Sequence, residues 1–104
     1  MSDPKQKLTP QQIEDAALTG WRQADQTIRA EFDTGDFATG LRLVNLIGES
    51  AETANHHPDL TLTYPSVAVT LSSHDVNGLT SRDVDLARTI NRHAAELGVE
   101  AKEG

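Results

Sequence analysis

Hydrophobic and polar positions alternate in two stretches of the chain, and this alternation predicts four strands. Residues 27–32 alternate with a period of two, which is typical of a strand with one buried face. Residues 21–24 are the expected hairpin partner of this strand. Residues 67–71 alternate in the same way, and residues 60–64 are expected to pair with them across a turn at Pro65-Ser66. The pattern therefore predicts two strand pairs.

A helical spacing of apolar residues predicts three helices, of which the first covers residues 10–18. Thr9 can cap this helix, and Pro10 suits the first helical position. We expect its buried face to consist of three apolar residues, Ile13, Ala17 and Leu18.

The longest helix is expected over residues 36–55, with Asp36 as its N-cap. Its apolar stripe is predicted to consist of six residues: Phe37, Leu41, Val44, Ile47, Ala51 and Ala54. Gly40 and Gly48 lower the helix propensity, so we expect them to allow close packing against a neighbouring element. Pro58 is expected to end the helix, because the residue before a proline is pushed out of the helical region.

The last helix is expected to begin at Thr80, which forms a T-x-x-D arrangement with Asp83 that is close to a capping box. Gly98 follows as its C-terminal cap. The predicted core face consists of apolar residues at helical spacing: Val84, Leu86 or Ala87, Ile90, Ala94 and Leu97.

This element order predicts an α+β fold, in which a four-stranded antiparallel sheet carries three helices packed on one face in the order α-β-β-α-β-β-α. We expect one domain over residues 9–98, preceded by a flexible leader at 1–8 and followed by a polar tail at 99–104.

Composition excludes several classes of function. The chain has 16 acidic and 9 basic residues, a formal net charge of -7, no Lys/Arg run and few aromatic residues. This argues against direct nucleic-acid binding and against anionic membranes. The absence of cysteine excludes disulfides and thiolate chemistry. The N-terminus has no secretory signal, and no apolar segment could span a bilayer, so we expect a cytoplasmic protein.

The His56-His57-Pro58 sequence is the candidate site for chemistry. Glu52 lies four residues before His56, so both side chains share a face if the helix persists. The helix C-terminus and Glu52 would then both favour the protonated form of His56. An imidazole can both give and take a proton near neutral pH. His74 follows the 67–71 strand and by parity points off the core, so a sheet end and a helix end could meet around the three histidines.

Each of these residues also has a purely structural interpretation. Adjacent histidines at a helix end are more often surface residues, and Glu52 could make a solvated contact within the helix. Asp83 could serve as a helix cap alone, and Trp21 could be a core residue. Three histidines and a carboxylate could bind zinc, but adjacent histidines diverge and the H-E-x-x-H pattern is absent. No nucleophile motif or phosphate-binding loop is present.

Taken together, seven fixed positions resemble the signature of the pterin-4a-carbinolamine dehydratases. They are Glu52-x3-His56-His57-Pro58-x5-Tyr64-x9-His74-x8-Asp83. Gly20-Trp21, Asp36-Phe37, Thr70-Leu71-Ser72 and the run from Gly78 to Asp83 also look like this family. The resemblance covers roughly residues 8 to 97 and implies the same fold as the element order.

The resemblance implies a hydro-lyase that converts 4a-hydroxytetrahydropterin to the quinonoid dihydropterin during pterin recycling. It makes His56 and His74 the acid/base pair, without a metal or cofactor. It assigns substrate binding to His57, Glu52 and Trp21, with Glu52 also holding His56 or its neighbours in place. Asp83 and Pro58 would support the site. The family also implies a homodimer or homotetramer.

Three positions depart from the family pattern. Leu60 stands where many relatives have an aromatic residue, Asn55 where some have Asp, and Ser73 where Thr is usual. None of these changes removes a histidine. The alternative function is a catalytically weak family member that acts as a protein-binding or regulatory module, in which case the helices would carry the function.

Overall fold

The fold is built on one antiparallel sheet. In the computed structural model, which describes residues 3–102, the sheet order is β1 (Arg22–Ala24), β2 (Thr27–Asp33), β4 (Ser66–Leu71) and β3 (Asp59–Leu62). A fifth strand, β5 (Glu100–Ala101), pairs antiparallel with the C-terminal end of β2. The two predicted hairpins are confirmed, although β3 ends before Tyr64.

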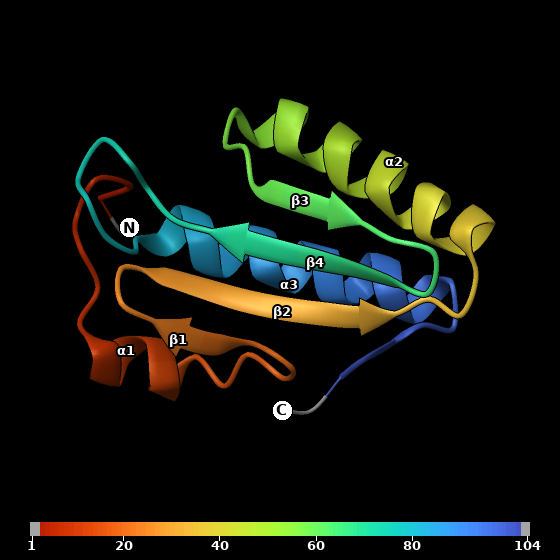
Figure 1. The fold of residues 1–104 in the computed structure, drawn as a ribbon. Coiled ribbons are helices and arrows are strands. Elements are labelled where there is room, and N and C mark those ends of the chain that lie inside the picture. The colour runs from red at the N-terminus through yellow and green to blue at the C-terminus, as the bar shows by residue number, and fades with distance from the viewer. Residues whose placement is uncertain (1–2, 103–104) are drawn as a thin grey trace.

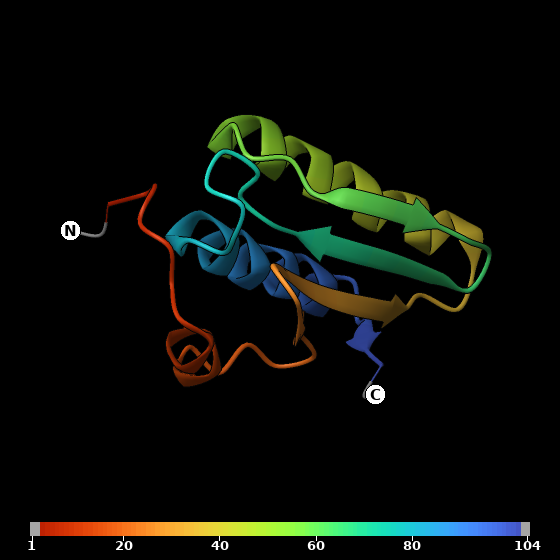
Figure 2. The same ribbon diagram turned by 60° about the vertical axis from the view of Figure 1, so that its left-hand side comes forward.

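Three helices accompany the sheet: α1 (Pro10–Asp15), α2 (Phe37–Ala54) and α3 (Ser81–Glu96). Figures 1 and 2 show α2 and α3 side by side on one face of the sheet, while α1 lies near β1. The core between sheet and helices contains the alternating residues of β2 and β4, namely Ile28, Ala30, Phe32, Val67, Val69 and Leu71. The predicted α+β class is therefore confirmed. Within residues 3–102, no helix is long and apolar enough to cross a membrane.

The first helix is shorter than predicted. Thr9 caps it as expected, with its side chain accepting from the Gln12 N–H at 3.1 Å. The helix ends at Asp15, and Ala17 adopts a positive φ of 53° and is exposed. Ile13 is buried and Leu18 half-buried. The prediction for Ala17 was wrong because the chain leaves the helix before that residue can face the core.

The buried face of α2 also differs from the predicted stripe. It consists of four residues, Gly40, Leu43, Ile47 and Ala51. Phe37 and Leu41 are 47% and 45% exposed, and Ala54 is exposed as well. The difference arises because the helix turns Gly40 towards the sheet, where a Cβ atom would lie 2.7 Å from Leu62 Cδ1. The predicted close packing is confirmed at Gly40 but not at Gly48, where a Cβ would meet nothing within 4 Å.

The C-terminal half of α3 leads into a strand that the sequence pattern did not predict. Thr80 and Asp83 form the expected capping box, and the five predicted core positions from Val84 to Ala94 are buried. Gly98 has a φ of +70°, and the Val99 N–H returns to the Ala94 carbonyl at 2.8 Å. Val99 is then buried and β5 begins. At the other terminus, the Leu8 N–H donates to the Leu79 carbonyl at 2.7 Å. Residues 1–2 of the predicted leader and 103–104 of the predicted tail lie outside the described residues.

Candidate active site

The C-terminus of α2 sets the direction of His56. Asn55 adopts a left-handed conformation (φ 51°, ψ 43°), and the His56 N–H donates to the Ala51 carbonyl at 3.1 Å. This cap ends the helix at Ala54, which is three residues before His57, the residue that Pro58 excludes from the helical region. Asparagine tolerates the left-handed region better than most residues with a side chain. The helix does not persist to His56, so the condition under which His56 would share a helical face with Glu52 is not met.

His56 instead contacts Asp83 of α3. Its Nε2 atom lies 2.6 Å from Asp83 Oδ1, and the two side chains are 8% and 0% exposed. An ionised carboxylate can only accept, so Nε2–H of His56 is the donor and Nδ1 is left for other partners. His56 also lines a hollow of about 470 Å³ between α2 and α3.

Asp83 is held by two further donors. Its Oδ2 atom accepts from Ser73 Oγ at 2.8 Å and from the Thr80 N–H at 2.9 Å. Ser73 Oγ also lies 2.9 Å from Thr80 Oγ1. Asp83 is thus both a helix cap and the partner of His56, so its structural and site interpretations are compatible. Charge-assisted bonds of this kind are stronger than those between neutral groups, and they fix the carboxylate in place.

The same carboxylate links the segments that carry His56 and His74. Ser73 immediately precedes His74 and continues the alternation of β4. This alternation predicts that the Ser73 side chain points towards the core, whereas the His74 side chain points away from it. This parity was the sequence signal that could have identified Ser73 as part of the site. His74 itself is exposed, as expected, with Nε2 3.5 Å from Ser72 Oγ. No hydrogen bond joins His56 to His74 among residues 3–102.

His57 and Glu52 form a separate, exposed pair. His57 Nε2 is in hydrogen-bond contact with Glu52 Oε2, and the side chains are 57% and 76% exposed. Glu52 therefore orients His57 rather than His56. Beyond the histidines, Arg82 binds Asp75 at 2.8 Å and lowers the pKa of that carboxyl by hydrogen bonding. This contact ties the turn that follows His74 to the first turn of α3.

Several known proteins are similar to this chain. The family described as Pterin 4 alpha carbinolamine dehydratase matches residues 6–93. A protein of Thermosynechococcus vestitus with the provisional name pterin-4-alpha-carbinolamine dehydratase is 40% identical over 86% of this chain and 96% of its own length. A protein of Nostoc punctiforme with the same provisional name is 38% identical over 84% and 96%. This chain belongs to the pterin-4a-carbinolamine dehydratase family.

A solved structure supports the same relationship at the level of the fold. It is the crystal structure of a transcriptional coactivator/pterin dehydratase from Brucella melitensis, with 34% sequence identity and a TM-score of 0.82. The match covers 86% of this chain and 99% of that chain. The pterin-4a-carbinolamine dehydratase fold thus extends over nearly the whole domain.

The three departures from the family pattern have structural roles in this dehydratase family member. Leu60 is half-buried and packs against the hydrophobic core from β3. Asn55 supplies the left-handed cap of α2, and Ser73 donates to Asp83. Each substitution is therefore accommodated locally without disturbing the bond between His56 and Asp83.

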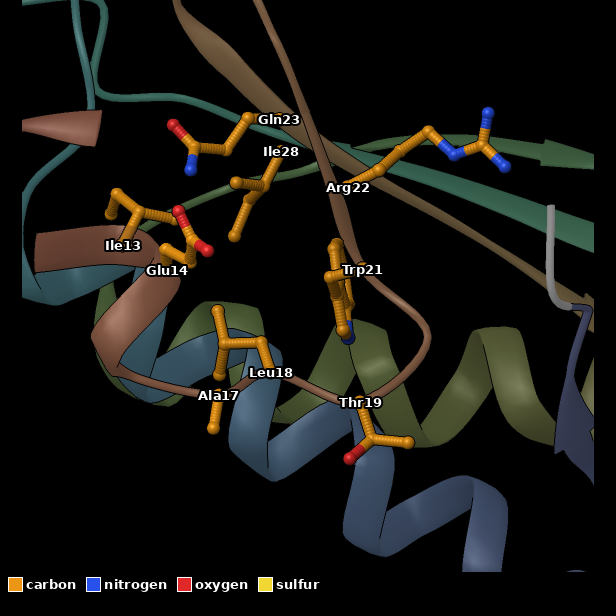
Figure 3. Close-up of a pocket in the computed structure, with 9 residues that line it drawn as sticks. All are labelled: Ile13, Glu14, Ala17, Leu18, Thr19, Trp21, Arg22, Gln23 and Ile28. Carbon is orange, nitrogen blue, oxygen red and sulfur yellow. The ribbon is translucent and has the colours of Figure 1, made fainter. Parts of the chain in front are cut away.

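Trp21 lies at a different cavity from His56. Its Nε1–H donates to Asn91 Oδ1 at 2.9 Å, and its ring meets Phe32 edge-on. It lines a cavity of about 400 Å³ that no histidine lines. Figure 3 shows its side chain at this cavity together with that of Leu18. The structure gives Trp21 a packing role, and its role in substrate binding stays a prediction. Within residues 3–102, no three His, Asp or Glu side chains are grouped so that they could hold a metal ion.

Proposed function

We propose that this chain dehydrates 4a-hydroxytetrahydropterin to the quinonoid dihydropterin, with His56 and His74 as the acid/base pair. The observation that carries the proposal is the buried bond between His56 and Asp83. A histidine that is oriented by a carboxylate has a fixed tautomer, and its second ring nitrogen is free for proton transfer. His56 lines a hollow that could admit a small molecule.

The reaction needs two proton transfers. The C4a–O bond breaks and the hydroxyl leaves as water, so one imidazolium must donate a proton to that oxygen. A ring nitrogen of the pterin loses its proton, so one neutral imidazole must accept it. The net change is the loss of one water molecule without oxidation or reduction. The proposal therefore requires neither metal nor cofactor.

We assign supporting or reacting roles to the two exposed histidines, His57 and His74, neither of which lines the hollow beside His56. His74 is on the turn after β4 and is reachable from solvent. His57 is oriented by Glu52 and is equally accessible, so we assign both residues of this pair to substrate contact. Asp83 positions His56, and Pro58 fixes the exit of the chain from the histidine pair. We further propose that the protein acts in the cytoplasm, as a homodimer or homotetramer.

A protein-binding role is the second candidate function. Phe37 and Leu41 are nearly half exposed on α2, and large apolar residues on a helix surface are typical of association sites. The Brucella structure, which is named a transcriptional coactivator as well as a pterin dehydratase, is consistent with this alternative. In that case the histidines would not be needed for the function.

A rate measurement separates the two candidates. Dehydration of synthetic 4a-hydroxytetrahydropterin would be followed by ultraviolet absorbance with wild type, His56→Ala and His74→Ala. Glu96→Ala is the control, because Glu96 is exposed at the end of α3 and does not line the hollow beside His56. We expect each of the two site variants to lose about 10²-fold or more in kcat, the contribution typical of a general acid or base. A wild-type rate equal to that of buffer would refute the enzyme proposal.

A further inference from the structure

A cationic hollow lies on the sheet face opposite α2 and α3. It has a volume of about 620 Å³ and is formed by β1, β2, β4 and the residue that follows β5. Three cations line it, namely Arg22, Arg29 and Lys102, against one carboxylate, Glu31. The chain contains only nine Lys and Arg residues and has a net charge of -7. One third of its cations therefore gather at one site with a local charge of +2.

Strand register brings the two arginines together. Arg22 of β1 is directly opposite Arg29 of β2. Side chains at such positions share a face, with Cβ atoms roughly 4.5–5.5 Å apart, and like charges there repel each other. Within residues 3–102, neither arginine has a carboxylate oxygen within 4.0 Å. An anion bound between them would remove this repulsion.

The lysine has a partner of its own. The Lys102 N–H donates to the Glu31 carbonyl at 2.7 Å, and Lys102 Nζ lies 3.1 Å from Glu31 Oε2. Glu31 and Arg29 are two residues apart on β2, so they lie on the same face. The charges of Lys102 and Glu31 therefore neutralise each other, whereas the two positive charges of Arg22 and Arg29 are not neutralised by a carboxylate of the described residues.

The neighbouring strand β4 carries short side chains on the face that lines the hollow. Thr70 of β4 is opposite Arg29, and Ala68 is opposite Glu31, so short side chains leave room above the sheet. On the next strand, Asp59 is opposite Thr70 and does not line the hollow. The volume is within the range of small-molecule sites.

We propose that this hollow binds a phosphate-type dianion, either inorganic phosphate or a small phosphate monoester, between Arg22 and Arg29, with Lys102 at the rim. Two guanidinium groups present forks of N–H donors that match the oxygens of a phosphate. A dianion also equals the local charge of +2. None of the histidines lines the hollow, so the site is independent of the proposed dehydration.

The test is a titration followed by ¹H–¹⁵N NMR at constant ionic strength. Wild type, Arg29→Gln and Arg22→Gln would be titrated with sodium phosphate, with glycerol phosphate and with sodium chloride. Arg42→Gln is the matched control, because Arg42 is an exposed arginine on α2 and its loss changes the net charge equally. The spectra also report whether each variant is folded.

We expect saturable shifts at β1 and β2 with phosphate and not with chloride. The loss of either arginine should weaken binding about tenfold, the value of one charge-assisted hydrogen bond, whereas Arg42→Gln should bind like wild type. Tighter binding of glycerol phosphate identifies a monoester as the ligand, and equal binding identifies free phosphate. Shifts that do not saturate, or equal weakening in Arg42→Gln, would overturn the proposal.

Discussion

The Nε2 atom of His56 lies 2.6 Å from Oδ1 of Asp83, and both side chains are buried. The pair joins the chain that leaves α2 to the first turn of α3. Because Ser73 bonds the other oxygen of Asp83, the carboxylate also holds the segment before His74. The loss of one member of a buried pair leaves the other polar group without its partner, which costs more than the bond itself contributes.

We therefore expect Asp83→Asn to lower the free energy of unfolding by about 1–3 kcal/mol. An amide has one oxygen, so it cannot accept from His56 on one side and from Ser73 and Thr80 on the other. Urea denaturation measures the change. Asp85→Asn is the control on the same helix, because Asp85 is exposed and its substitution should change stability by less than about 0.5 kcal/mol. Equal effects of the two variants would show that the buried network does not stabilise the fold.

Two glycines of α2 should respond to alanine in opposite directions. A Cβ at Gly48 would meet nothing within 4 Å, so Gly48→Ala should stabilise the protein by about 0.5–1 kcal/mol through helix propensity. A Cβ at Gly40 would lie 2.7 Å from Leu62 Cδ1 and 3.3 Å from Thr34 Oγ1. Displacing these groups outweighs the propensity gain, and Gly40→Ala should destabilise by about 1 kcal/mol. Thermal denaturation of both variants checks this, and stabilisation by Gly40→Ala would show that Leu62 moves freely.

These glycines also show what the sequence could predict. Period-two alternation located β2 and β4, and capping residues located the start of each helix, because both are local signals. The face that α2 turns to the sheet depends on the fit of Gly40 against Leu62. The helical spacing of apolar residues does not reveal this fit. The short strand β5 was missed because two residues carry no period.

The site shows the same division between local and tertiary information. The signature grouped His56, His57 and Asp83 in one candidate site, and the structure brings His56 and Asp83 into contact. Their partners were not predictable, because the left-handed Asn55 rotates His56 from Glu52 towards Asp83. Likewise, Arg22 and Arg29 are separated in the sequence and meet only through strand register.

The N-cap of α2 should make stability depend on pH. Asp36 accepts from the Thr39 N–H at 2.7 Å, and this hydrogen bond holds the pKa of the carboxyl below its ordinary value. The ionised cap therefore stabilises the fold above the ordinary carboxyl pKa, and this contribution is lost as the pH falls through the lowered value. Asp36→Asn keeps an acceptor but does not titrate. We expect wild type to exceed this variant in urea midpoint at pH 7, and the difference should disappear as the pH falls through the lowered pKa of Asp36. A difference that stays constant with pH would contradict the assignment.

Alanine substitutions at Gly20 and Gly35 distinguish the cost of backbone strain from the cost of a steric clash with β5. Gly20 and Gly35 have φ values of +85° and +78°, so alanine at either position must adopt the left-handed region, at about 1–2 kcal/mol. A Cβ at Gly35 would meet nothing within 4 Å, so Gly35→Ala measures this strain alone. A Cβ at Gly20 would lie 2.4 Å from the Cβ of Ala101. Gly20→Ala must therefore also displace β5 from β2 and should destabilise by about 1 kcal/mol more than Gly35→Ala.

Hydrogen exchange at the Lys102 amide, which donates to the Glu31 carbonyl, should accelerate in Gly20→Ala and not in Gly35→Ala. Equal exchange in the two variants would show that β5 does not depend on the close approach of Gly20.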